Sequence, residues 1–314
     1  MLAAFALLAP LLSEPDSDIG RTFIEAVAAD GVQFIGYTPS TLDPRDPANN
    51  AAVATADLQA DLDALRPAFD GLVLYGYHES LTPRIVQAAA DRGFRSVLLG
   101  IWNPKSADET DGVVALAEQF GGRMRCAIVI GNEGLWFDRY VPADIEAAAA
   151  RIRHRLPSVP LATSEPFISF QQDQRHSGFV RSFGDLLAPN IHPIFDRPDM
   201  DAAAAARWTR QTAAELAEQT GKPLLLKETG FPHAGKEKFS PESQQTFWET
   251  LLDGGAVAGP AESPAYLAVA FEAFDLAWKS ESSGLEYERS WGLLSPEREP
   301  LPSFDWWKRR APAQ

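Results

Sequence analysis

Two glutamates stand where apolar runs of the chain end. Glu133 closes IVIGNE (128–133), and Glu228 follows the run that begins at Leu224. A carboxylic acid can protonate a leaving oxygen, and a carboxylate can attack or stabilise the carbon that this oxygen leaves. Paired carboxylates in one cleft are therefore typical of enzymes that cleave glycosidic bonds, a chemistry that requires the two runs to end opposite each other.

The elements that must position these glutamates are eight short apolar runs. The runs cover residues 32–37, 71–77, 96–102, 126–133, 160–166, 188–195, 223–230 and 266–274. Near-continuous Val, Ile and Leu, without polar alternation, is what parallel strands covered on both faces require. Helix signals lie between the runs: Pro142 opens a helical stretch, Gly221 ends another, and Ser106 with Glu109 reads as a capping box.

This alternation predicts an α/β protein with a (β/α)8 TIM barrel as its single domain, over residues 21–314. A doubly wound sheet is the alternative, but such a sheet usually carries a glycine-rich phosphate turn after its first strand, and the sequence has none. Residues 1–20 form an apolar and then acidic N-terminal segment. It reads either as the remnant of a signal or anchor or as an amphipathic lid on the barrel.

The composition restricts the partners. The chain has 28 basic and 43 acidic residues, a formal net charge of −15, and this surplus disfavours nucleic acid and anionic membrane surfaces. No run other than the N-terminal one is a candidate to enter a membrane, and the first 12 residues are too short to span one. The five histidines show no metal-binding spacing, so we expect neither a metal nor a cofactor.

In a (β/α)8 barrel the active site lies at the carboxyl ends of the strands. The predicted strand ends carry Tyr37, Tyr75, Tyr77, Trp102, Asn132, Glu133, Glu165, His192, Glu228, Glu272 and Asp275. Trp102, Trp136, Trp278 and Trp291 lie just past strand ends, where flat rings can stack on sugars. If strand alternation continues, Lys227 points away from Glu228 towards the helices, and Glu165 is a hydrogen-bonding residue of a loop.

Several motifs carry a resemblance. IVIGNE resembles the acid/base strand of clan A glycoside hydrolases, and KETGFP (227–232) resembles the nucleophile motif of glycoside hydrolase family 17, the β-1,3-glucanase family. GYTP (36–39), TSEP (163–166), NIHPIF (190–195), FEAFDLAWK (271–279) and ERSWGLL (288–294) fall in that family's order. The chain resembles a divergent bacterial-type member over roughly residues 32 to 295.

The resemblance implies that Glu133 is the acid/base and Glu228 the nucleophile of a retaining pair, with Asn132 on the sugar 2-hydroxyl. The substrate-binding residues it suggests, together with the strand-end aromatics, are Tyr37, Tyr75, Tyr77, Trp102, Asn132, Trp136, His192, Phe231, Glu272, Trp278, Lys279 and Glu288. One departure affects the site: Leu276 replaces an acid that would partner Lys279, so we expect Glu272 or Asp275 to compensate.

We therefore expect a retaining glycoside hydrolase or transglycosylase that acts on β-glucan, with the β-1,3 linkage implied by the resemblance. The alternatives are a catalytically impaired glycan-binding barrel and an enzyme for another β-glucan linkage. We expect a monomer that needs no cofactor. A polymer substrate favours the periplasm, the cell envelope or the medium, although a cytoplasmic location stays open.

Overall fold

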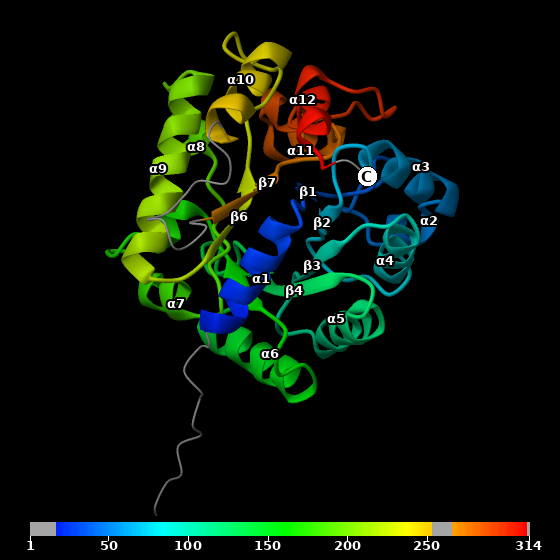
Figure 1. Ribbon diagram of the computed structural model, residues 1–314, viewed down its shortest axis with the longest axis vertical. Helices are drawn as coiled ribbons and strands as arrows, with labels where there is room; N and C mark the ends of the chain where they lie inside the picture. The colour runs from blue at the N-terminus through cyan, green and yellow to red at the C-terminus, as the bar shows by residue number, and fades with distance from the viewer. Residues whose placement is uncertain (1–16, 253–265, 313–314) are drawn as a thin grey trace, which may run out of the picture.

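The computed structural model describes residues 17–252 and 266–312, which form a ring of helices around a barrel of parallel strands (Figure 1). The strands are β1 (Phe34–Gly36), β2 (Gly71–Val73), β3 (Ser96–Ile101), β4 (Arg125–Asn132), β5 (Leu161–Ser164), β6 (Leu224–Thr229) and β7 (Tyr266–Ala270). The longer helices are α1 (Ser17–Ala29), α3 (Thr55–Leu65), α4 (Thr82–Asp91), α5 (Ala107–Phe120), α6 (Pro142–Arg155), α9 (Ala202–Thr220), α10 (Pro241–Leu252) and α12 (Pro302–Arg310). The short helices are α2 (Asn49–Ala52), α7 (Ser177–Ser182), α8 (Pro193–Asp196) and α11 (Ala277–Ser283), with 3₁₀ turns at Phe167–Phe170 and Glu286–Arg289.

The described strands pair in the order β5-β4-β3-β2-β1-β7-β6, and every pair is parallel. The nearly closed sheet confirms the predicted barrel. The place between β5 and β6 is taken by residues 187–190, where Leu187 bridges to Leu224 and Asn190 bridges to both Pro166 and Glu228. These isolated bridges complete the circle of strands.

The prediction of a regular strand over residues 188–195 is wrong in its extent. Only the bridges at 187–190 have strand character, and Pro193 opens the short helix α8. Proline lacks the N–H that a strand ladder needs and is well suited to the first turn of a helix, so the chain leaves the sheet at His192.

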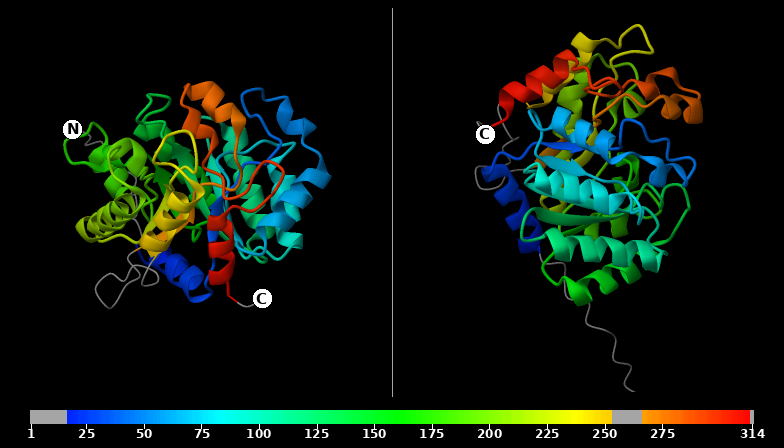
Figure 2. Two further views of the ribbon diagram at one scale, coloured as in Figure 1. Left: turned by 90° about the horizontal axis from the view of Figure 1, so that it is seen from above. Right: turned by 90° about the vertical axis from the view of Figure 1, so that its right-hand side faces the viewer.

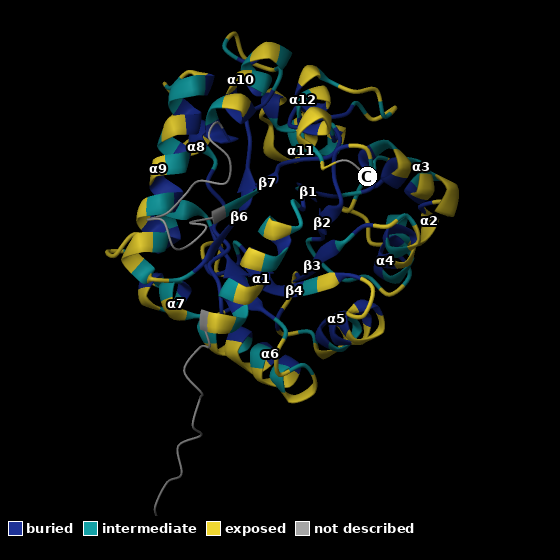
Figure 3. Cartoon of the chain, in the orientation of Figure 1, coloured by how far each residue is buried: buried dark blue, intermediate teal, exposed yellow. Residues whose placement is uncertain are grey.

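Buried residues alternate along the strands between two clusters. One set, which includes Phe34, Val73, Leu98 and Leu225, fills the inside of the barrel. The neighbouring positions, such as Ile35, pack outward against the helices. Figure 3 shows the result, with buried strands inside and exposed outer faces on the helices. This two-sided burial explains why the strand sequences are apolar throughout.

Helix α1 closes the amino-terminal end of the barrel. Phe23, Ile24 and Val27 pack into the inner cluster beside Phe34. The contact is close, because a Cβ at Gly20 would lie 2.1 Å from a backbone oxygen of the loop before Leu187. Residues 17–20, which the sequence analysis assigned to the N-terminal segment, therefore belong to this helix. The two readings of the apolar residues 1–12 concern a part of the chain outside the described residues.

Candidate active site

A continuous set of hydrogen bonds joins the two predicted catalytic glutamates at the carboxyl ends of β4 and β6. Lys227 donates from Nζ to Glu228 Oε1 at 2.7 Å and to Asn132 Oδ1 at 2.8 Å. Asn190 donates from Nδ2 to the same Asn132 oxygen at 3.2 Å and to Glu133 Oε1 at 2.9 Å. The structure thus brings Glu133 and Glu228 into one buried polar network.

His192 contacts the other oxygen of Glu228. Its Nε2 lies 3.2 Å from Glu228 Oε2, and the ring is enclosed by Phe271 and Trp291, with centroids 5.0 and 5.2 Å away. Although burial lowers the pKa of His192, the hydrogen bond and charge of Glu228 outweigh it and raise that pKa. An imidazole in this place fixes the orientation of the Glu228 carboxylate.

The two glutamates have opposite electrostatic surroundings. Burial would raise the pKa of Glu228, but the charges and hydrogen bonds of Lys227 and His192 outweigh it and lower the pKa to about 2. Burial raises the pKa of Glu133, and the negative charge of Glu228 raises it further. One carboxyl is held ionised and the other is biased towards its protonated form, which is the division that a nucleophile and a general acid require.

An irregularity at the end of β4 turns Glu133 into the site. Between Val129 and Asn132 the strand advances three residues while β5 advances two. Gly131 lies at φ +83°, and a Cβ there would meet the Tyr140 hydroxyl at 2.2 Å, so glycine is required. Glu133 itself lies at φ +56°, a region that costs a non-glycine residue about 1–3 kcal/mol and that is found at functional sites.

A second irregularity at the end of β6 corrects the prediction for Lys227. From Leu226 to Thr229 the strand advances three residues while β7 advances two. Leu225 faces the barrel interior, and by alternation Lys227 shares that face, where its side chain is 1% exposed. The predicted placement towards the helices is therefore wrong. The bulge lets the adjacent Glu228 reach the same site.

Tyr75 lies between the acids. Lys227 Nζ is 4.7 Å from its ring centroid, and burial followed by the charges of Glu228, Glu272 and Glu133 raises the pKa of its hydroxyl. Within the described residues this buried hydroxyl has no hydrogen-bond partner. It is therefore a neutral group that can bond to a ligand.

A cavity of 610 Å³ opens over the network. The predicted site residues that line it are Tyr37, Tyr75, Tyr77, Trp102, Asn132, Glu228, Trp278 and Lys279. Phe271 and His78 line it as well. The volume is sufficient for a short oligosaccharide segment, and most of the lining is aromatic or apolar, as in other pockets for organic ligands.

Trp136 does not line the cavity. It is 43% exposed, and its neighbour Phe137 is 63% exposed. Glu165 holds this loop, because its carboxylate accepts the backbone N–H groups of Leu135 and Trp136 at 2.9 and 3.1 Å. Burial raises the pKa of Glu165 to about 7. The contacts are those of the hydrogen-bonding loop residue that the sequence analysis expected.

The substrate-binding prediction for Phe231 disagrees with its place in the structure. Phe231 is 1% exposed and packs against Phe239 and Phe247, with ring centroids 5.1 and 5.8 Å away. A ring enclosed by two others has no free face for a sugar. The strand ends one residue after Glu228, so Phe231 already belongs to the core beside α10.

Tyr37 lines the cavity with its ring only. Its hydroxyl donates to Asp61 Oδ2 at 3.0 Å, and Asp61 is fully buried and also accepts from Ser40 and Arg298. The hydroxyl therefore anchors the loop after β1 and is not directed at a ligand.

The polar pair around Lys279 is present in altered form. Lys279 donates to Glu272 Oε1 at 2.5 Å, so Glu272 takes the part of the acid that Leu276 replaces. Burial raises the pKa of Glu272 to about 7 despite Lys279. Asp275 instead pairs with His233, whose Nε2 lies 2.9 Å from Asp275 Oδ2.

Glu288, which the resemblance also suggests as a substrate-binding residue, is half-buried. Its negative charge raises the pKa of both His192 and Glu272.

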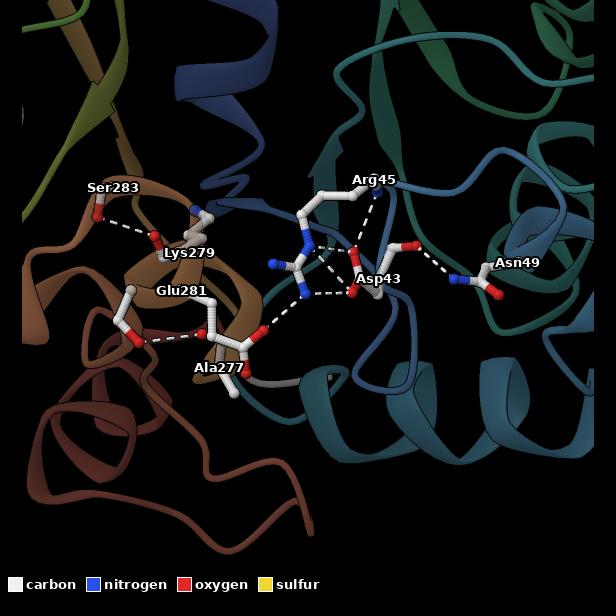
Figure 4. A network of polar contacts seen from close by, with 8 residues as sticks. Asp43, Arg45, Asn49, Ala277, Lys279, Glu281 and Ser283 are labelled. Carbon is white, nitrogen blue, oxygen red and sulfur yellow. Dashed lines mark hydrogen bonds and ion pairs between the residues drawn. The ribbon is translucent and has the colours of Figure 1, made fainter.

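The loop after β1 and helix α11 approach each other at one edge of the cavity. Arg45, in the loop after β1, pairs with Asp43 and reaches Glu281 of α11 at 2.7 Å, as Figure 4 shows. Asn49 donates to the backbone oxygen of Asp43, and within α11 Ser283 donates separately to the backbone oxygen of Lys279. Arg45 lines the cavity, so this exposed pair limits one edge of the opening.

Sequence reasoning missed several residues of the network. Asn190 is the first residue of the motif NIHPIF, but nothing in the sequence marks it as a partner of the glutamates, and strand alternation predicts the wrong face for Lys227. Glu109 was read as a capping-box residue. Ser106 does cap the helix, but the Glu109 carboxylate instead accepts the backbone N–H groups of Tyr77, Trp102 and Asn103.

Over residues 17–252 and 266–312, no group of three or more His, Cys, Asp or Glu side chains is arranged to hold a metal ion. No helix in that part of the chain is long and apolar enough to cross a membrane.

Comparison with known proteins gives a consistent result. Residues 35–292 match the BtgE/BtgC glycoside hydrolase domain. A putative glucan endo-1,3-beta-glucosidase btgC of Aspergillus niger is 30% identical over 277 residues, which cover 77% of this chain and 39% of the relative. A probable beta-glucosidase btgE of Aspergillus clavatus is 28% identical over 67% of this chain and 36% of its own length. The chain thus spans less than two fifths of these curated relatives.

Among solved structures, a beta-1,3-glucanosyltransferase of Rhizomucor miehei, described as a glycoside hydrolase family 17 enzyme, has the same fold. Its active-site mutant in complex with laminaritriose superposes with a TM-score of 0.64 at 17% identity, over 87% of this chain and 96% of that one.

Proposed function

Because the chain belongs to the BtgE/BtgC glycoside hydrolase domain family, we propose that it is a retaining glycoside hydrolase or transglycosylase acting on β-1,3-linked glucan. The observation that carries this proposal is the opposite electrostatic setting of Glu133 and Glu228 within one network. The names of the relatives from Aspergillus niger and Rhizomucor miehei support the linkage.

In the proposed reaction, Glu228 attacks the anomeric carbon while Glu133 gives its proton to the leaving oxygen. The bond from the anomeric carbon to that oxygen breaks as a covalent glycosyl-enzyme ester forms. Glu133, now ionised, then takes a proton from water or from a sugar hydroxyl, whose oxygen displaces Glu228. Water gives hydrolysis and an acceptor sugar gives transglycosylation.

The geometry around Asn132 supports its proposed contact with the sugar 2-hydroxyl. Lys227 can only donate, so the oxygen of the Asn132 amide must face it, and Asn190 donates to the same oxygen. The Asn132 NH₂ group is thereby left as a donor at the cavity, which it lines. A donor on the 2-hydroxyl strengthens its bond as charge develops in the transition state.

The motif order and the Rhizomucor miehei structure support the finer proposal that the chain is a member of glycoside hydrolase family 17. The named relatives are fungal, and they give no support to a bacterial-type branch. The alternative of an impaired binding barrel started from a broken Lys279 network, and the Glu272–Lys279 pair removes that premise. We also propose that the protein acts outside the cytoplasm, since a glucan polymer is its proposed substrate, and that it acts as a monomer.

The test is to incubate the protein with laminari-oligosaccharides and to separate the products by chromatography. Shorter products indicate hydrolysis, and products longer than the substrate indicate transfer. Glu228→Gln and Glu133→Gln should each abolish turnover, whereas Glu118→Gln, an exposed glutamate paired with Arg155 on the helix ring, should not. Unchanged laminari-oligosaccharides with the wild-type protein would refute the substrate, and full activity of Glu228→Gln would refute the nucleophile.

A further inference from the structure

A second cavity of 250 Å³ adjoins the first. It is lined by Trp102, Asn103, Lys105, Arg139 and Tyr140, and Trp102 also lines the 610 Å³ cavity. Trp102 is 46% exposed, so one aromatic ring forms the boundary between the two spaces. A ligand that fills the larger cavity and extends past Trp102 enters the smaller one.

Two cations bound this smaller cavity. The Arg139 guanidinium lies 4.1 Å from the centroid of the Trp102 ring and donates to the backbone oxygen of Asn132. Lys105 donates from Nζ to the backbone oxygen of Arg139 at 2.8 Å. Both cations are therefore held in place by neutral carbonyl groups.

The acids near this cavity are engaged elsewhere. Asp138, the neighbour of Arg139 in sequence, pairs with Arg175 at 2.7 Å. Glu109 is occupied by three backbone N–H groups, two of them from Trp102 and Asn103. Neither Lys105 nor Arg139 has a carboxylate within salt-bridge distance among the residues that the structure describes, in a chain with 15 more acids than bases.

We propose that this cavity is a subsite for a negatively charged substituent, a carboxylate or an acidic ester, carried by a sugar of the bound glycan. Arg139 covers one face of the Trp102 ring, and the exposed remainder of that ring can contact the sugar, while Lys105 and Arg139 supply donors of opposite charge to the substituent. A neutral sugar would leave both cations without a carboxylate in salt-bridge contact, with Glu165 acting on Arg139 only at longer range, whereas an anionic substituent pairs with both. This inference rests on the proposed function, since it extends that substrate from neutral to acid-substituted β-glucan.

The test measures binding in the Glu228→Gln background, in which substrate is not consumed. Isothermal titration calorimetry compares laminaripentaose with the same pentasaccharide oxidised at C6 to carboxylates and with one sulfated at C6. The acidic ligands should bind about tenfold more tightly than the neutral one, as expected for one charge-assisted hydrogen bond. Whichever acidic ligand binds more tightly shows whether the subsite prefers a carboxylate or an acidic ester.

Lys105→Glu should abolish the preference, so that the ratio of acidic to neutral dissociation constants rises about tenfold, from about 0.1 to about 1. Lys308→Glu is the matched control. It makes the same charge change on α12, outside both cavities, and should leave the ratio as it is. Equal binding of acidic and neutral ligands, or equal ratios in both variants, would overturn the inference while leaving cleavage of neutral laminaripentaose by the wild-type protein intact. Loss of that cleavage would instead refute the proposed function.

Discussion

Replacing Lys227 by methionine tests whether this buried ammonium keeps Glu228 ionised. The side chain is 1% exposed and its Nζ lies 2.7 Å from Glu228 Oε1. An opposite charge at such a distance lowers a carboxyl pKa by about 1–3 units. In Lys227→Met the pKa of Glu228, held at about 2, should therefore rise by about that amount. As the pH is lowered, the variant should therefore lose activity at a higher pH than the wild-type protein does.

The same pair should affect stability in a pH-dependent way. The pKa of Glu228 is lower in the folded protein than the value of ~4.3 expected when unfolded, so the pair stabilises the fold above that unfolded value. The stabilisation is lost as pH falls towards 2. The gap is equivalent to about 3 kcal/mol, and breaking a buried ion pair typically costs about 3–5 kcal/mol.

The assay is the pH dependence of kcat/KM for laminaripentaose, with urea unfolding measured at each pH to confirm that the variant is folded. Lys222→Met is the control, because Lys222 is also partly buried but donates to the backbone oxygens of Phe183 and Gly184. Lys222→Met should lose stability, but the pH at which kcat/KM falls on the acid side should stay that of the wild type. A folded Lys227→Met protein whose acid limb coincides with that of the wild type would refute the reasoning.

Three further changes test other parts of the site. Lys279→Met should destabilise the fold more at pH 8 than at pH 5, by at most about 1.4 kcal/mol, because Glu272, with a pKa of about 7, is protonated at pH 5 and pH 8 lies only about one unit above that pKa; equal losses in urea unfolding at both pH values would contradict this. Phe231→Ala should cost about 3–5 kcal/mol in urea unfolding and leave KM nearly unchanged, since the ring is core; a raised KM at unchanged stability would restore it to the site. Tyr37→Phe should cost about 0.5–1.5 kcal/mol through loss of the bond to Asp61, and thermal unfolding that shows no loss would exclude that role.

Much of the fold could be predicted because parallel strands covered on both faces must be apolar. The apolar runs located the strands, and the polar residues that end them included Glu133 and Glu228. The run before His192 was apolar for the same reason, yet it forms only bridges. Pro193 limits the strand character to residues before it, because proline lacks the N–H that a strand ladder needs and begins helix α8.

The details of the site could not be predicted, because they depend on departures from strand periodicity. The bulges in β4 and β6 insert one residue each, and such an insertion changes which side chains share a face. Lys227 was therefore misplaced. Asn190 contacts Asn132 and Glu133 across 58 and 57 residues of sequence, and no local pattern reports such a contact.

Helix α1 has a practical consequence. It closes the amino-terminal end of the barrel, and Pro312 lies against Gly31 at the same end, so both ends of the described chain are on the side opposite the cavity. Figure 2 shows this in its right-hand view, with α1 and the C-terminus on one side and α11 on the other. A solid support attached at residue 312 would therefore leave the mouth of the cavity facing away from the support, where it is accessible even to a large insoluble particle.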